Sequence, residues 1–168
     1  LDEAMEKNRA LGAWAIIERI RTGEVLAMVS RPAFNPNDFR NVSDNEKLNR
    51  AIGYVFEPGS TFKPAVVAAA LNENVVTPDT VFNCENGSWF YMGKVLRDYH
   101  PYGQLTVADV VKKSSNIGAA KIALMLGDRR LDRYLREFGI GRRLGIDLPG
   151  EEIGILPPVS KWSKISAS

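Results

Sequence analysis

The sequence predicts an α+β fold, in which a β-hairpin precedes a group of helices. Three observations predict it. Strand-forming residues flank a turn within the first 30 positions, apolar helical segments occupy the middle of the chain, and residues 139–160 are rich in Gly and Pro. Because two strands are only marginally stable alone, we expect further strands to complete a sheet, and residues after 150 do not supply them.

The first half of the chain divides into five segments. Residues 1–10 are mostly charged and are predicted to be helical. Residues 12–19 and 24–29 read as two strands joined by a turn at Thr22-Gly23. The polar stretch 30–56 has no clear period. A helix is then expected over residues 60–71, apolar nearly all round and therefore buried, with Pro64 in its first turn, where a missing N–H costs little.

The second half is predicted to be mainly helical after an irregular or β region at 78–103. Thr106 and Asp109 resemble a capping box that opens a short helix. A second helix, 117–126, is apolar and ends at Gly127. Asp128 is expected to cap a third helix, whose apolar residues follow helical spacing: Leu131, Tyr134, Leu135 and Phe138.

Composition excludes several kinds of site. The 168 residues contain one Cys and one His and carry a net charge of +2. A single Cys, Cys84, which is expected in a polar loop, excludes an intrachain disulfide and a Cys-rich zinc site. A single His, His100, excludes a multi-histidine metal site and directs the search for a catalytic base to Lys, Asp and Glu. We therefore expect no metal, no cofactor and no nucleic-acid partner.

Ser60 and Lys63 are the first candidates for chemistry. Three residues apart, they share a helix face with Cβ atoms roughly 5–6 Å apart. A serine hydroxyl becomes a good nucleophile when a base removes its proton. Lys63 can be that base only if it is neutral, and burial on an apolar helix together with the positive potential of a helix N-terminus favours the neutral amine. The alternative for this tetrapeptide is an N-cap serine beside a solvated lysine.

Ser114-Ser115-Asn116 is the second candidate, because it interrupts two predicted helices where side chains can point into a cleft. Ser114 could relay protons, and Asn116 could hold a substrate amide through its donor and its acceptor. Ser and Asn are also common helix caps, so this tripeptide alone is a weak signal.

Together these motifs resemble those of the serine acyl-transferases that include penicillin-binding proteins and class A β-lactamases. The wider sequence strongly resembles the transpeptidase domain of class B penicillin-binding proteins, and its division-type branch more than its elongation branch. The resemblance spans residues 10–165 and rests on these stretches: 22–28, Asn49-Arg50-Ala51, 56–64, Arg97-Asp98 with His100, 113–118, 138–141 and 147–151.

The resemblance implies a peptidoglycan D,D-transpeptidase. Ser60 would attack the D-Ala-D-Ala bond of a stem peptide, with its own N–H as half of an oxyanion hole. Lys63 would take its proton, Ser114 would pass a proton to the leaving D-alanine, and Asn116 would hold Lys63 and substrate. An amine of a neighbouring stem would then take the acyl group, and β-lactam antibiotics would acylate Ser60. A division or elongation glycosyltransferase complex is the implied partner.

The family's third motif, Lys-Thr-Gly or Lys-Ser-Gly, does not follow Asn116 in this sequence. We therefore expect residues 1–168 to be part of a transpeptidase domain, incomplete at the C-terminus and inactive alone, with residues 1–10 a helix or linker from a preceding domain. The resemblance places the protein on the extracytoplasmic, periplasmic face of the bacterial cell membrane, held by an N-terminal anchor helix outside this chain. Two alternatives are a non-catalytic penicillin-recognising or scaffold module and a β-lactamase relative, although no Glu-x-x-x-Asn follows Asn116.

Overall fold

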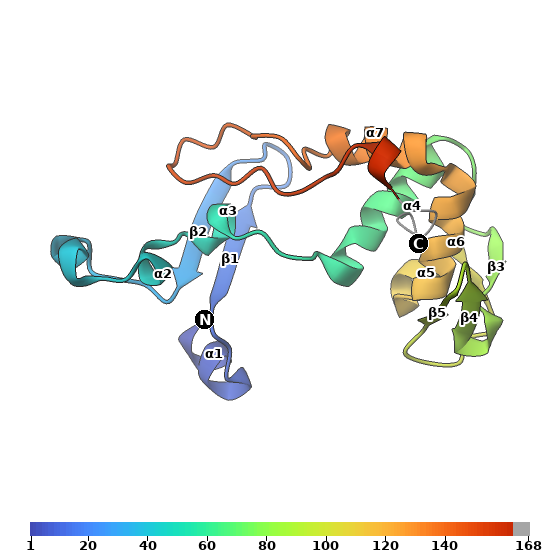
Figure 1. Ribbon diagram of the computed structural model, residues 1–168, viewed down its shortest axis with the longest axis horizontal. Coiled ribbons are helices and arrows are strands. Elements are labelled where there is room, and N and C mark those ends of the chain that lie inside the picture. The colour runs from blue at the N-terminus through green and yellow to red at the C-terminus, as the bar shows by residue number, and fades with distance from the viewer. Residues whose placement is uncertain (163–168) are drawn as a thin grey trace. The chain divides into compact units, whose positions relative to one another are not determined.

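The computed structural model describes residues 1–162 and divides the chain into two compact units. One unit comprises residues 1–56 and 143–154, and the other comprises residues 57–142 with the segment from 155 onward. Helices and small antiparallel sheets make up both units, which confirms the predicted α+β class (Figure 1).

The first unit is built on the predicted hairpin. Its strands β1 and β2 pair antiparallel from Ala13 opposite Arg31 to Glu18 opposite Val25, with an irregularity at Glu18. The charged start of the chain is helical, as predicted. The elements of this unit are α1 (Asp2–Asn8), β1 (Ala13–Glu18), β2 (Val25–Arg31), the 3₁₀-helix η1 (Pro36–Asn41), α2 (Asp44–Lys47) and α3 (Arg50–Gly53).

Four α-helices form the core of the second unit. Helix α6 packs against α4, α5 and α7, and strand β5 also contacts it. Because α4 and α6 are apolar on most sides, their side chains meet in one buried cluster with those of α5 and α7. The helical elements are η2 (Gly59–Phe62), α4 (Lys63–Asn72), η3 (Glu85–Gly87), α5 (Val107–Lys113), α6 (Asn116–Leu126), α7 (Asp128–Glu137) and η4 (Val159–Lys161).

Two short two-stranded sheets cover this helical core. Strand β3 pairs with β6, and β4 pairs with β5, both antiparallel. The β4–β5 pair ends at Arg97, so the chain leaves the sheet directly beside the first turn of α6, where Asn116 donates to the Arg97 carbonyl. These strands are β3 (Val81–Asn83), β4 (Ser88–Tyr91), β5 (Lys94–Arg97) and β6 (Gln104–Thr106).

Three details differ from the sequence prediction. The helix expected from Ser60 begins as the 3₁₀-turn η2, and regular α-helix starts at Lys63. Asp128 is the first residue of α7 rather than its cap; Gly127, at φ 85°, holds the cap position without a side chain. Cys84, expected in a polar loop, is fully buried under α6 as a free thiol.

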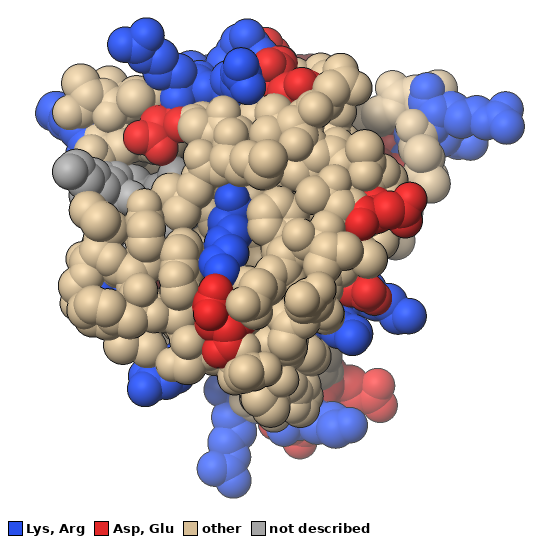
Figure 2. Space-filling view, turned by 90° about the vertical axis from the view of Figure 1, so that its right-hand side faces the viewer, with Lys and Arg blue, Asp and Glu red and all other residues tan. Residues whose placement is uncertain are grey.

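Lys, Arg, Asp and Glu side chains are scattered among uncharged residues on the face shown in Figure 2, and charges of both signs lie near one another there. Across residues 1–162, no helix is long and apolar enough to cross a membrane.

Candidate active site

Ser60 lies in the 3₁₀-turn that leads into α4. Gly59, immediately before it, has φ 55°, a left-handed conformation that costs residues with a Cβ roughly 1–2 kcal/mol. This turn brings the exposed Ser60 onto the same side as Lys63, because side chains three apart eclipse in a 3₁₀-helix. The predicted proximity of the two residues is confirmed, although a different helix type produces it.

Ser114 and Asn116 flank a sharp break between α5 and α6. Ser114 ends α5 in a left-handed conformation, with φ 55° and ψ 41°. Ser115 caps α6 by accepting a hydrogen bond from the N–H of Gly118. Asn116 is therefore the first residue of α6, and its side chain stands at the helix start, beside that of Ser114.

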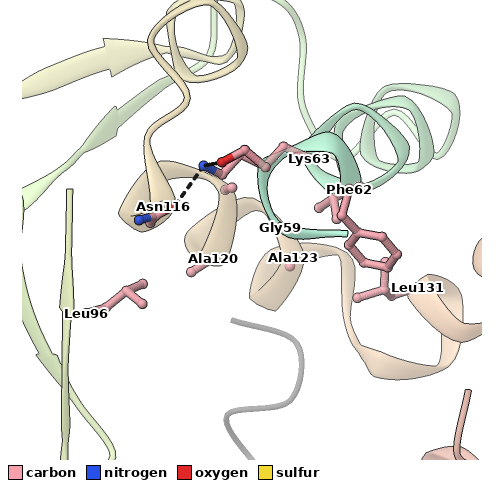
Figure 3. A pocket seen from close by; sticks show the side chains of 11 residues that line it. Gly59, Phe62, Lys63, Leu96, Asn116, Ala120, Ala123 and Leu131 are labelled. Carbon is pink, nitrogen blue, oxygen red and sulfur yellow. Dashed lines mark hydrogen bonds between the residues drawn. The ribbon is translucent and has the colours of Figure 1, made fainter. Parts of the chain in front are cut away.

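The Lys63 amine is the centre of the site. Its Nζ lies 3.0 Å from Ser60 Oγ, 2.9 Å from Ser114 Oγ, 2.6 Å from the Ser114 carbonyl oxygen and 2.7 Å from Asn116 Oδ1. Figure 3 shows the Lys63 side chain reaching from the start of α4 toward Asn116 on α6. The structure thus brings all four predicted residues together, across 56 positions of sequence.

Four oxygens surround an amine that has at most three protons to donate. Two of them, the Ser114 carbonyl and Asn116 Oδ1, can only accept. A neutral amine satisfies both with its two N–H groups and keeps one lone pair, which can receive the proton of the Ser60 hydroxyl. The geometry is therefore matched to a lysine that acts as a base.

The electrostatics of Lys63 favour the same form. Burial of its partly exposed side chain lowers the pKa of the amine below its ordinary value, because the charged form loses hydration. The carboxylate of Asp98 acts in the opposite direction and raises that pKa, and the effect of burial is the larger. Lys63 is therefore easier to deprotonate than a solvated lysine.

Sequence reasoning gave no role to Asp98, which the structure places directly beneath this turn. Its carboxylate accepts hydrogen bonds from the backbone of Asn116 and Ile117 and from the Ser115 hydroxyl. The signal in the sequence was the dipeptide Arg97-Asp98. Its contact with α6 arises only when β5 packs beside that helix, 18 residues away along the chain.

A cavity of about 290 Å³ adjoins Ser60 and Lys63. Its walls combine these two polar side chains with apolar groups of α4, α6 and α7, as Figure 3 shows for Ala120, Ala123 and Leu131. The lining residues are Gly59, Ser60, Phe62, Lys63, Val66, Leu96, Asn116, Ala119, Ala120, Ala123 and Leu131. An apolar hollow with few polar groups is typical of a small-molecule or peptide site.

His100 is exposed, faces the rings of Tyr99 and Tyr102, and does not line this cavity. Within residues 1–162, no cluster of His, Cys, Asp and Glu could hold a metal ion.

Ser-x-x-Lys on one helix and Ser-x-Asn at the start of another form the motif pair that is typical of penicillin-recognising serine acyl-transferases. The family model of the penicillin-binding protein transpeptidase domain matches residues 13–168, and the chain belongs to this family. The class B resemblance seen in the sequence is thereby confirmed.

Curated relatives share this region at moderate identity. Peptidoglycan D,D-transpeptidase FtsI of Escherichia coli is 39% identical over 166 residues, which cover 98% of this chain and 28% of FtsI. Penicillin-binding protein PbpB of Mycolicibacterium smegmatis is 36% identical over 168 residues, covering 98% of this chain and 26% of PbpB. The chain thus spans about a quarter of the length of these two relatives.

Two solved structures have the same fold. A peptidoglycan glycosyltransferase from Burkholderia ambifaria superposes with a TM-score of 0.86 at 36% identity, covering 99% of this chain and 49% of that one. The transpeptidase domain of penicillin-binding protein 3 from Burkholderia pseudomallei gives 0.87 at 35% identity, covering 99% and 46%. These likenesses confirm the predicted fold as an incomplete penicillin-binding transpeptidase fold.

Proposed function

We propose that this chain supplies the nucleophile, the base and the proton relay of a peptidoglycan D,D-transpeptidase. The observation that carries the proposal is the position of Lys63 Nζ, 3.0 Å from Ser60 Oγ and in contact with two oxygens that can only accept. This arrangement leaves the amine lone pair for the serine proton. Membership of the transpeptidase family supports the same chemistry.

Acylation begins when Ser60 Oγ attacks the carbonyl carbon of the penultimate D-alanine and its proton moves to Lys63. The carbon–nitrogen bond to the last D-alanine breaks, and the leaving amine takes a proton from the Lys63 ammonium through the Ser114 hydroxyl. The Ser60 N–H stabilises the oxyanion. Asn116 holds Lys63 through Oδ1 and receives the substrate amide.

Transfer reverses these proton movements. An amine of a neighbouring stem peptide attacks the acyl-enzyme, its proton passes to Lys63, and Ser60 Oγ leaves and regains a proton. A β-lactam undergoes only the acylation of Ser60, because opening its ring keeps the leaving group attached to the acyl-enzyme. The proposal thus includes stem peptides and β-lactam antibiotics as ligands.

Membership of the family supports a proposal about the wider setting of the protein. We propose that the domain works on the extracytoplasmic face of the membrane, in a division or elongation complex that contains a glycosyltransferase, with division preferred. Residues 1–168 form part of a transpeptidase domain in this proposal, and residues 1–10 lead in from a preceding segment. The family's third motif, Lys-Thr-Gly or Lys-Ser-Gly, and the second donor of the oxyanion hole would come from outside this chain, so residues 1–168 alone would react poorly.

Acylation by a fluorescent penicillin tests the proposal directly. In the full gene product that contains this chain, we expect a stable covalent label on the peptide that contains Ser60, located by mass spectrometry. Ser60→Ala should remove the label, and Ser88→Ala, an exposed serine on β4, should keep it. Absence of label would favour a non-catalytic module, and rapid loss of the label by hydrolysis would favour a β-lactamase.

A further inference from the structure

Asp98 occupies the N-terminus of α6 with both carboxylate oxygens engaged. Oδ1 accepts hydrogen bonds from the backbone N–H of Asn116 at 2.5 Å and of Ile117 at 3.0 Å. Oδ2 accepts the hydroxyl proton of Ser115 at 2.7 Å. A negative charge is favoured there, because the first N–H groups of a helix have no intrahelical partner and carry partial positive charge.

Ser115 extends this contact into the helix. Its side chain is fully buried, and its hydroxyl oxygen accepts a hydrogen bond from the Gly118 N–H at 2.9 Å while its proton is directed to Asp98. A buried hydroxyl committed in both directions has one preferred orientation. Asp98 therefore fixes the middle residue of the Ser114–Asn116 turn as well as its last residue.

The dipeptide Arg97-Asp98 also fixes the orientation of the side-chain amide of Asn116. The Nδ2 group of Asn116 donates to the carbonyl oxygen of Arg97 at 2.8 Å, so the other end of the amide, Oδ1, must face Lys63 Nζ at 2.7 Å. Arg97 thus sets which end of the amide meets the lysine, and Asp98 sets where the amide stands.

We propose that Asp98 is a positioning residue for acyl transfer, which holds the Ser114–Asn116 turn against Lys63. This inference rests on the proposed function, because it assigns a means of alignment to that same site. Misplacing a reacting group by about 1 Å costs on the order of 10²-fold in rate, so loss of these three hydrogen bonds should cost about as much.

Because Asp98 is charged, its role can be detected in the pH dependence of acylation, which an uncharged structural contact would not change. Lys63 faces the hydroxyl of Ser60 from η2, the hydroxyl and carbonyl of Ser114 from the end of α5, and the amide of Asn116 from α6, none of which is charged. The charged group that acts on Lys63 is the carboxylate of Asp98, which raises the lysine pKa.

The surroundings of Asp98 complete the account of its charge. The Ser115 hydroxyl donates to Asp98 and lies 3.4 Å from the buried thiol of Cys84, whose pKa is raised chiefly by burial and further by Asp98. A neutral thiol adds no charge to the site. Removing the charge of Asp98 therefore acts on the reaction mainly through Lys63.

Three variants of the full gene product separate position from charge. The pH dependence of Ser60 acylation by a fluorescent penicillin is measured for each. Asp98→Ala removes contacts and charge, and we expect a loss of about 10²-fold in maximal rate. Asp98→Asn keeps two acceptor contacts and removes the charge, so the midpoint of the acid limb should move to lower pH. Ser115→Ala keeps the charge, so the maximal rate should fall with no change in midpoint.

Asp109→Asn is the matched control, since Asp109 is also a carboxylate in the first turn of a helix and accepts from Thr106 at 3.0 Å. It should leave both the rate and the midpoint unchanged. An unchanged midpoint in Asp98→Asn together with a normal rate in Asp98→Ala would overturn the inference. Absence of wild-type labelling at Ser60 would instead overturn the proposed function. If Asp98→Ala fails to fold, Asp98→Asn and Ser115→Ala still decide the matter.

Discussion

The side-chain oxygen of Asn116 lies 2.7 Å from Lys63 Nζ, and its amide nitrogen is bound to the Arg97 carbonyl. Replacing this neutral acceptor by a carboxylate should therefore place a negative charge directly on the lysine. We expect Asn116→Asp to stabilise the ammonium form, slow acylation at neutral pH and move the acid limb of the pH profile upward.

Asn116→Ala is the comparison for this variant, because it removes the acceptor without adding charge. It should lower the rate across the whole pH range and leave the midpoint near the wild-type value. Stopped-flow acylation with a chromogenic cephalosporin measures both. A downward movement of the midpoint in Asn116→Asp would contradict the assigned contact.

The lowered pKa of Lys63 predicts how wild-type acylation depends on pH. Only the neutral amine can take the serine proton, so the rate should rise with pH as Lys63 loses its own proton. Because burial lowers that pKa, the rise should be centred below 10.5, the ordinary value for lysine. A rate that is flat with pH, or that rises only above the ordinary lysine range, would show that Lys63 is not the base.

Ser114 combines the hydroxyl proposed as the proton relay with a strained backbone, at φ 55°. A left-handed residue with a Cβ costs roughly 1–2 kcal/mol, and glycine avoids this cost. We therefore expect Ser114→Gly to be more stable than Ser114→Ala by about 1 kcal/mol in urea unfolding. Both variants lack the proton relay and should acylate slowly.

Lys112, exposed in the last turn of α5, is the control position for this comparison. A helical residue is less stable as glycine than as alanine, by up to about 1 kcal/mol, so Lys112→Gly should be less stable than Lys112→Ala. The glycine variant should therefore be more stable than the alanine variant at position 114 and less stable at position 112. The same order at both positions would contradict the left-handed conformation of Ser114.

Much of this arrangement was predictable from local pattern. Apolar periodicity and turn residues predicted the hairpin and the helices, and the spacing of Ser60 and Lys63 predicted their contact. The start of α4 was less predictable, since a 3₁₀-turn and an α-helix place residues three apart on one face alike. The contact of Asp98 with the start of α6 could not be predicted, because it depends on β5 packing beside that helix, and local periodicity carries no information about such packing.

Gly118 allows α5 and α6 to approach closely behind the site. A Cβ at this position would collide with Val110 and come within 3.2 Å of Ser115 Oγ. We expect Gly118→Ala to cost about 1–3 kcal/mol of stability and to slow acylation, because the helices that carry Ser114 and Asn116 are pushed apart. Adding Val110→Ala should restore part of the acylation rate. Normal acylation by Gly118→Ala alone would argue against this packing.

The proposed division of the site between this chain and a missing lysine motif predicts a difference between two proteins. A polypeptide of residues 1–168 alone should react with fluorescent penicillin far more slowly than E. coli FtsI. A chimaera, in which residues 1–168 replace the matching 166-residue segment of FtsI, should recover labelling at Ser60. Loss of one oxyanion donor alone lowers the reaction rate about 10²–10³-fold. We therefore expect the chimaera to label faster than residues 1–168 alone by a factor of about this size.

Circular dichroism of the 168-residue polypeptide checks that slow labelling does not come from an unfolded chain. The Ser60→Ala chimaera checks that recovered label sits on this serine and not on another residue of the host protein. If residues 1–168 alone label as fast as the chimaera, the second oxyanion donor and the lysine motif are not needed for acylation. The acyl-transfer site would then lie wholly on the second unit, around Lys63.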